Sequence, residues 1–231
     1  MAIQLPLDIT LRDSATFENF IASRNEQIID ALQKFARAQG EAFVYLAGKP
    51  GTGRTHLLQA VCHGSGEHGL CAAYLPLEQH QHYAPEMLEG WENFQIICLD
   101  DIDAVAGKMD WEQALFHLFN RVRESGGHLV VTAAMMPSQL PCVLPDLQSR
   151  LGWGLALNVT ELQDDDKIVA LQKRAAERGL ELPQDVANYL LRRCPRDMAT
   201  LLAMLRELDT QSLAAQRRLT IPFVRELLPT E

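Results

Sequence analysis

The feature that most constrains this chain is a glycine-rich loop between an apolar run and a helical one. The segment AFVYLAGKPGTGRTHLL (42–58) has the pattern of a buried strand, a turn and the start of a helix. Its turn has the spacing Gly48-x-x-x-x-Gly53-Arg54-Thr55, in which glycines let successive backbone N–H groups point at phosphate oxygens. The helix that follows adds the positive end of its dipole. The segment therefore predicts a phosphate-binding loop inside a strand–loop–helix unit.

One position of this loop departs from the usual pattern, because Arg54 stands where a lysine is expected. Arginine keeps the positive charge but replaces a compact ammonium with a broad planar fork. A fork can hold phosphate oxygens with two parallel hydrogen bonds. It fits less readily between the last two phosphates of a triphosphate, so we expect nucleotide binding to survive this exchange better than hydrolysis. The alternative is a glycine-rich turn that binds no ligand.

A second apolar run, FQIICLDD (94–101), ends in two acids and complements the loop. Asp100 at the tip of a neighbouring strand is expected to hold Mg²⁺ through water, with the hydroxyl of Thr55 as a direct ligand. Asp101 is the candidate for orienting an attacking water. It is a methylene shorter than the glutamate of many related ATPases, and a misplacement of about 1 Å lowers catalysis strongly. Taken without the loop, these acids indicate only a solvated strand end.

Apolar strand-like runs alternate with helical patterns through the first two thirds of the chain, which predicts an α/β fold with a parallel sheet covered on both faces. The strand-like runs lie at 42–47, 71–77, 94–100, 128–134 and 155–159, and the helical patterns at 25–39, 55–63 and 111–125. After about residue 160 the strand signals stop and four helical patterns follow. We therefore expect a short N-terminal segment (1–12), a nucleotide-binding domain (13–160) and a small all-α domain (161–231).

Two arginines outside the loop are candidates for contacts with phosphate. Arg150, in LPDLQSRLGWGL (144–155), is either a surface residue or an arginine finger presented to a nucleotide on a neighbouring molecule. Arg196, in CPRDM (194–198), opens a helix from which it could reach phosphates, although Arg192 and Arg193 compete for that role. Spacing alone leaves both alternatives open.

Composition and charge limit the remaining functions. The formal net charge is −9, whereas a protein that holds DNA by itself shows a basic surplus, so we expect no strong direct DNA binding. The five cysteines are widely spaced and include no C-x-x-C pair, which disfavours a zinc site or a disulfide framework. The start, MAIQLPLDITLRD, lacks a basic region followed by an apolar core, and no apolar run could span a membrane. These features predict a cytoplasmic protein. The three tryptophans are expected to pack in or around the core.

The segments TFENFIASRNEQ (16–27), GKPGTGRTHLL, IICLDDID, LQSRLGWGL and RDM together resemble the DnaA/Hda family of AAA+ proteins. The resemblance covers nearly the whole AAA+ module and implies a P-loop core with a parallel five-stranded sheet flanked by helices, followed by a C-terminal α-helical lid. The chain ends after the lid, without the helix-turn-helix of DnaA. Regulators in this family bind the DNA-loaded sliding clamp of DNA polymerase III, dock on ATP-bound DnaA and promote hydrolysis of that ATP. This stops re-initiation of replication.

The resemblance also assigns roles to residues. Gln4, Leu5 and Leu7 would contact the clamp, and Arg150 would act in trans on the ATP of DnaA. The nucleotide, ADP or ATP with possible Mg²⁺, would be held by residues of the loop, of the N-terminal segment and of the lid: Phe20, Ile21, Gly48, Pro50, Gly51, Thr52, Gly53, Arg54, Thr55, His56 and Arg196.

The sequence also departs from the family pattern. QLPL (4–7) is a shortened clamp motif, and Thr132-Ala133-Ala134 replaces Thr-Ser-Asp, so we expect the polar group of the first sensor to be largely lost. These exchanges favour a regulator that holds ADP over an autonomous AAA+ ATPase, such as a helicase loader or an initiator paralogue. A small nucleotide kinase is a third possibility. A homo-oligomer also remains possible.

Overall fold

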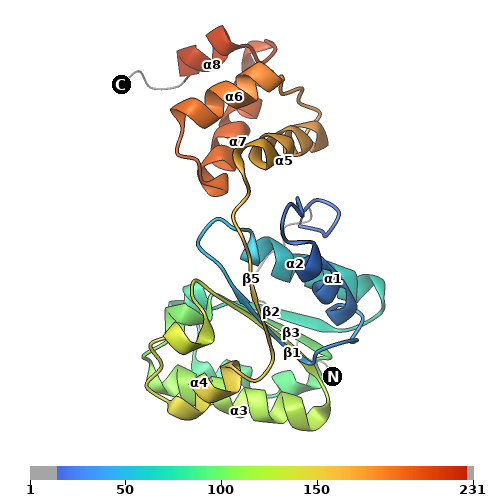
Figure 1. Ribbon diagram of the computed structural model, residues 1–231, viewed down its shortest axis with the longest axis vertical. Helices are drawn as coiled ribbons and strands as arrows, with labels where there is room; N and C mark the ends of the chain where they lie inside the picture. Colours follow the sequence, from blue (N-terminus) through green and yellow to red (C-terminus); the bar gives the residue numbers. More distant parts are fainter. Residues whose placement is uncertain (1–14, 228–231) are drawn as a thin grey trace. The chain divides into compact units, whose positions relative to one another are not determined.

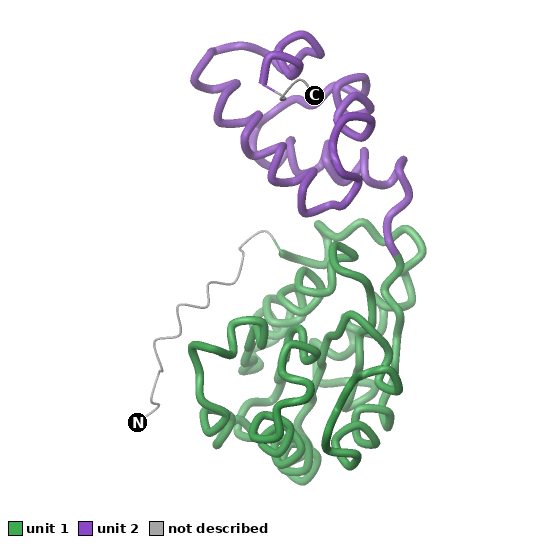
Figure 2. Tube along the Cα trace, turned by 90° about the vertical axis from the view of Figure 1, so that its left-hand side faces the viewer, with its two compact units in different colours: residues 1–160 green, residues 161–231 purple. Residues whose placement is uncertain are grey.

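The computed structural model describes residues 15–227 of the chain. These residues belong to two compact units, which divide between Thr160 and Glu161 (Figure 2). The proposed clamp-contact residues Gln4, Leu5 and Leu7 lie outside the described residues. Among the helices of residues 15–227, none is both long enough and apolar enough to span a membrane.

The first unit is built on a sheet whose strands are all parallel, as the apolar runs predict. In the described part of the chain this sheet has five strands in the order β2-β3-β4-β1-β5. The strands are β1 (Phe43–Ala47), β2 (Ala72–Pro76), β3 (Ile96–Asp100), β4 (His128–Ala133) and β5 (Leu155–Asn158). The order places β4 between β1 and β3, so the loop after β1 and the acids after β3 flank the end of β4.

Helices cover both faces of this sheet (Figure 1). Alternate residues of β1 point to opposite faces: Val44 and Leu46 pack with helices α1 and α2, whereas Tyr45 and Ala47 pack with α3 and α4. The helices are α1 (Glu26–Phe35), α2 (Arg54–Glu67), α3 (Met109–Ser125) and α4 (Pro145–Leu151). Burial on both faces explains why the strands are apolar at successive positions. Short 3₁₀ helices connect these elements: η1 (Leu77–His82), η2 (Pro85–Leu88), η3 (Trp91–Asn93), η4 (Ile102–Val105) and η5 (Pro137–Gln139).

Backbone and side-chain hydrogen bonds join the ends of the strands around the glycine-rich loop. The N–H of Gly48 donates to the carbonyl of Ala133 at 3.1 Å, which ties the start of the loop to the end of β4. Asn25, which is 1% exposed, exchanges hydrogen bonds with the backbone of Thr160 at 2.9 and 3.2 Å. The segment before α1 is therefore fixed to the chain just after β5.

The second unit consists of helices around its own apolar core. They are α5 (Asp164–Glu177), α6 (Gln184–Arg193), α7 (Met198–Ala215) and α8 (Ile221–Leu227). The apolar residues Leu201, Leu205 and Leu208 of α7 are buried in this core. Asp197 caps this helix, because its carboxylate accepts the N–H of Thr200 at 2.8 Å. Local capping and helical periodicity thus account for the helical unit.

Candidate nucleotide-binding site

The glycine-rich loop adopts a conformation that its glycines make possible. Gly51 and Gly53 have φ values of +85° and +96°, in the left-handed region that glycine adopts readily. A Cβ at Gly48 would lie 2.8 Å from the hydroxyl oxygen of Thr52 and 3.0 Å from the carbonyl oxygen of Val159. The Thr52 hydroxyl donates to the carbonyl of Lys49 at 2.9 Å and closes the loop on itself. The turn thereby leads directly into the first turn of α2, whose N–H groups lack partners within the helix.

An aromatic side chain from the segment before α1 lies against this loop. A Cβ at Gly53 would be only 2.7 Å from Cε2 of Phe20, so only glycine allows this approach. The Phe20 ring is 5.5 Å from the ring of His56, and Nε2 of His56 bonds to the carbonyl of Thr16 at 2.8 Å. Because a carbonyl only accepts, the proton of His56 lies on Nε2. The structure therefore brings together Phe20 and His56, both expected near a nucleotide, and Ile21 follows, half-buried, in the same segment.

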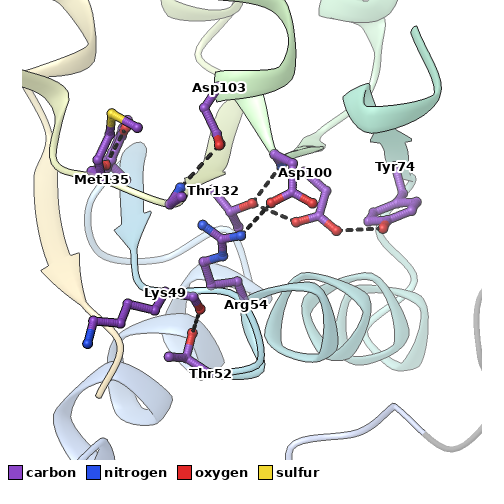
Figure 3. Close-up of polar contacts among 11 residues, drawn as sticks. Lys49, Thr52, Arg54, Tyr74, Asp100, Asp103, Thr132 and Met135 are labelled. Carbon is purple, nitrogen blue, oxygen red and sulfur yellow. Dashed lines mark hydrogen bonds and ion pairs between the residues drawn. The ribbon is translucent and has the colours of Figure 1, made fainter. Parts of the chain in front are cut away.

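Arg54 is buried at the start of α2, and among the described residues only one end of its guanidinium fork has a partner. Its Nη2 donates to Oδ1 of Asp101 at 2.6 Å (Figure 3). Its Nη1 is also buried, yet no described residue accepts a hydrogen bond from it. A buried guanidinium nitrogen without an acceptor is costly, and it marks a place where an anion from outside the chain would be stabilised. Sequence reasoning placed Arg54 on the phosphates but did not foresee its ion pair with Asp101.

Asp100 ends β3 and is held by two hydroxyl groups. Tyr74 donates to its Oδ2 at 2.8 Å and Thr132 to its Oδ1 at 2.6 Å, and the carboxyl group is 2% exposed (Figure 3). Burial and the neighbouring Asp100 charge raise the pKa of Tyr74 far above its usual value, so Tyr74 remains a donor. Sequence reasoning missed Tyr74. The available signal was its place near the end of a strand-like run, but the pairing of β2 with β3 could not be read from that run.

Thr132 connects the two acids that follow one another at the end of β3. Its hydroxyl donates to Asp100 and accepts the backbone N–H of Asp101 at 2.8 Å. The alanines at 133 and 134 carry no polar side-chain group, but the N–H of Ala134 donates to the carboxylate of Asp103 at 3.2 Å. The end of β4 therefore keeps one polar side chain, that of Thr132, in direct contact with the acidic strand end.

Asp101 lies in the left-handed region, with φ +54° and ψ +58°. Burial and the negative charge of Asp100 raise the pKa of Asp101 to about 6, although the Arg54 guanidinium acts in the opposite direction. The ion pair with Arg54 occupies Oδ1, one of the two carboxylate oxygens that could accept from a water. Asp101 therefore holds the guanidinium of Arg54, in addition to being the candidate for orienting an attacking water.

The residues present fit a nucleotide with a divalent cation. The unpaired Nη1 of Arg54 and the N-terminal end of α2 offer donors to phosphate oxygens. Within residues 15–227 no group of three or more His, Cys, Asp or Glu could hold a metal ion, so Asp100 and Thr55 would need phosphate oxygens and waters to complete a Mg²⁺ shell. Mg²⁺ is commonly held in this way, by one or two carboxylates together with substrate phosphates.

Arg150 lies on the other face of the sheet, at the end of α4, within an aromatic cluster. Its guanidinium carbon is 4.0 Å from the ring centroid of Trp153 and 5.7 Å from that of Phe116. Arg123 lies over the same Trp153 ring at 5.6 Å. The Nη1 of Arg150 is buried and finds no acceptor in the described part of the chain. Trp153 is 57% exposed and stacks with Arg150, and its ring lies 6.5 Å from that of the core residue Phe119, so this tryptophan packs at the edge of the core rather than inside it.

Arg196 is an exposed residue of the second unit. Its Nη1 donates to the carboxylate of Asp164 at 2.9 Å, so it connects the start of α7 with the start of α5. Among its competitors, Arg193 lies over the ring of Tyr189 at 6.0 Å. The assignment of Arg196 to a nucleotide stays a prediction.

A parallel five-stranded sheet with a glycine-rich loop at the end of its β1 strand, followed by a helical second unit, defines a P-loop protein of the AAA+ class. The sequence profile of the bacterial DnaA ATPase domain matches residues 11–158, and that of the Hda lid domain matches residues 164–228. The chain therefore belongs to the family of the bacterial DnaA ATPase domain, and its helical unit is a lid of the Hda type. This agrees with the resemblance seen in the sequence.

Solved structures with the same fold include initiators and a DNA motor. Domain III of the Thermotoga maritima replication initiation protein DnaA has a TM-score of 0.82 and 22% identity, covering 95% of this chain and 98% of that one. AMPPCP-bound DnaA from Aquifex aeolicus has a TM-score of 0.74 and 22% identity over 89% of this chain and 68% of its own. The Thermotoga maritima RuvB branch-migration motor has a TM-score of 0.71 and 15% identity over 94% and 71%. These likenesses confirm the AAA+ fold.

Proposed function

We propose that this protein is a regulator that holds a nucleotide, ADP in its working form, and promotes hydrolysis of DnaA-bound ATP in the presence of the DNA-loaded sliding clamp. The observation that carries the proposal is the ion pair between Arg54 and Asp101. It joins the cation of the loop to the acid expected to orient water, which disfavours hydrolysis in this site. The unpaired Nη1 of Arg54 still offers a phosphate donor, so binding is retained.

Different residues of the first unit would contact different parts of the nucleotide. Backbone N–H groups of Gly51 and Gly53 would point at the phosphates, while Gly48, Pro50 and Thr52 would shape the loop around them, since the N–H groups of Gly48 and Thr52 already bond within the protein. Thr55 and Asp100 would hold Mg²⁺. Phe20, Ile21 and His56 would lie near the base, and Arg196 would be contributed by the lid. The nucleotide would serve as a structural ligand that keeps the AAA+ module in the conformation that docks on DnaA.

Arg150 would act on the nucleotide of the partner. Its guanidinium is held over Trp153 by cation–π contact, an interaction of about 0.5–1 kcal/mol at exposed sites. A phosphate of a docked partner would offer a stronger, charge-assisted acceptor for the unpaired Nη1. Exchange of the aromatic contact for phosphate would stabilise the negative charge that develops during hydrolysis, as arginine fingers do.

The partners follow from the family and from the charge of the chain. Gln4, Leu5 and Leu7 would contact the sliding clamp of DNA polymerase III, and DnaA would dock on the face that carries Arg150. The net charge of −9 opposes strong direct DNA binding, so DNA would be reached through the clamp. We place the protein in the cytoplasm, and a homo-oligomer is compatible with the proposal.

Hydrolysis of DnaA-bound ATP, measured with and without this protein and clamp-loaded DNA, tests the proposal. We expect clear stimulation only when all components are present, and negligible ATP turnover by this protein alone. The Arg150→Ala variant should lose about 1,000-fold or more of the stimulation, from the lower end of the range known for arginine fingers upward. Arg123→Ala is the matched control, because Arg123 also lies over Trp153.

The outcomes distinguish a regulator of DnaA from an autonomous ATPase and test the role of Arg150. Steady ATP turnover by this protein alone, without an effect on DnaA, would favour the autonomous AAA+ ATPase instead. Stimulation by Arg150→Ala at the level of the unmodified protein would remove Arg150 from the proposed role while leaving the regulator itself intact.

A further inference from the structure

The ion pair between Arg54 and Asp101 divides the guanidinium fork into two ends with different partners. The Arg54 side chain is 9% exposed and that of Asp101 is 24% exposed, so this is a largely buried pair. One end, Nη2, donates to Asp101 at 2.6 Å. The other end, Nη1, is buried and has no acceptor among residues 15–227. The described residues therefore satisfy one end of the fork and leave the other open to an anion.

The carboxylate of Asp101 is held in place by the backbone rather than by the ion pair alone. Asp101 is the first residue after β3, and its N–H donates to the hydroxyl of Thr132 at 2.8 Å. The next residues form η4 (Ile102–Val105), in which Ile102 and Val105 are buried. With the backbone anchored on both sides, the Cα of Asp101 is fixed beside Arg54, which keeps the carboxylate within reach of the guanidinium. The ion pair between Arg54 and Asp101 is thus part of the structure of the site.

A phosphate-binding loop ordinarily uses the cation at the position of Arg54 to contact the last two phosphates of a triphosphate. A nucleoside diphosphate needs a donor at its own last phosphate, and the free Nη1 can supply it. A triphosphate needs the cation to reach one phosphate further, where the same cation is already bound to Asp101. Its third phosphate also adds negative charge close to a fixed carboxylate, and like charges at short range repel strongly in a partly buried site.

We propose that Asp101 is a specificity-determining residue: by holding one end of Arg54, it makes the site prefer a nucleoside diphosphate over a triphosphate. The inference rests on nucleotide binding as part of the proposed function and names the residue that selects the ligand. Asp101 acts through Arg54 and through its own charge, and the preference does not depend on hydrolysis.

The affinities of the full chain for ADP and for AMPPCP, a triphosphate analogue that is not hydrolysed at its β–γ bridge, test this inference. Isothermal titration calorimetry at fixed Mg²⁺, on protein freed of bound nucleotide, gives both dissociation constants. Asp101→Asn removes the charge but keeps the shape and an oxygen that can accept from Arg54. We expect the ratio of the AMPPCP constant to the ADP constant to fall about tenfold in this variant, chiefly through tighter binding of AMPPCP.

Asp103→Asn is the matched control. It removes the same charge two residues further along the chain, and the carboxylate of Asp103 accepts from the N–H of Ala134 rather than from Arg54. Its ratio should stay within about twofold of the unmodified protein, a change of less than about 0.5 kcal/mol in relative affinity. Tryptophan fluorescence of both variants checks that the first unit is folded, since all three tryptophans lie in it.

Four results would overturn the inference. Equal ratios in Asp101→Asn and the unmodified protein would show that the pair does not select the ligand. Equal shifts in Asp101→Asn and Asp103→Asn would assign the effect to net charge rather than to the ion pair. An unmodified protein that binds ADP and AMPPCP equally would refute the preference but leave the regulator untouched, whereas failure to bind either nucleotide would refute the inference and the nucleotide part of the proposed function together.

Discussion

The hydroxyl of Thr132 is the polar group on which the acidic strand end most depends, and Thr132→Val removes it with little change in shape. Thr132 is fully buried. Its hydroxyl donates to the Asp100 carboxylate at 2.6 Å and accepts the Asp101 N–H at 2.8 Å. Valine leaves a buried carboxylate with one donor fewer and a buried N–H without its acceptor. Both consequences destabilise the folded state.

The size of the effect follows from these two bonds. A hydrogen bond to a charged group contributes about 1.5–3 kcal/mol, and an unsatisfied buried N–H costs about 1–3 kcal/mol. We therefore expect Thr132→Val to lower the free energy of unfolding by about 3–5 kcal/mol, counting some relaxation. At roughly 2–4 °C per kcal/mol for a unit of this size, the unfolding midpoint should fall by about 10 °C.

Unfolding followed by tryptophan fluorescence measures this effect in the first unit, because Trp91, Trp111 and Trp153 all belong to it. Thr132→Ser is the control: it keeps the hydroxyl, loses one buried methyl group and should cost only about 1 kcal/mol. The reasoning is refuted if valine is tolerated within about 0.5 kcal/mol, or if serine is the more destabilising of the two replacements.

Two further predictions concern the loop and the support of α4. Gly53→Ala places a Cβ 2.7 Å from Phe20, at a position whose backbone is in the left-handed region. It should therefore lower the free energy of unfolding by about 1–3 kcal/mol and weaken ADP binding in calorimetry. The control Gly66→Ala lies in open space on α2 and should do neither. Glu112→Gln should lower the free energy of unfolding by about 2–4 kcal/mol in urea titrations, because this buried carboxylate accepts N–H groups of Gly107, Val143 and Leu144 at 2.6–3.1 Å. An unchanged urea midpoint would contradict this account of Glu112.

Much of the fold could be predicted because its signals are local. Apolar runs at 42–47 and 94–100 indicated buried parallel strands, and both strands are buried at every position. The spacing of Gly48 and Gly53 predicted the loop, whose backbone needs glycine for reasons of φ and of close approach. The four helical patterns after about residue 160 predicted the helical second unit. Each of these inferences uses residues within one loop, strand or helix.

The partners of the site residues could not be predicted in the same way. Arg54 and Asp101 are 47 positions apart, and Tyr74 and Asp100 are 26 apart. Which of these side chains meet depends on the order of the strands and on the register of β2 against β3, where a slip of one residue would turn Tyr74 to the other face. Likewise, the apolar character of Trp153 indicated burial, whereas its place after α4 exposes it beside Arg150.

By itself, the sequence determined that this chain has a glycine-rich loop after its first strand, a parallel α/β core and an all-α second unit, because glycine geometry and apolar periodicity act over a few residues. Only the tertiary structure decided what the arginine of that loop does. A charged fork pairs with whichever acid the fold brings within reach. Here the placement of β4 between β1 and β3 brings the hydroxyl of Thr132 to the end of β3, where it fixes Asp101 beside Arg54.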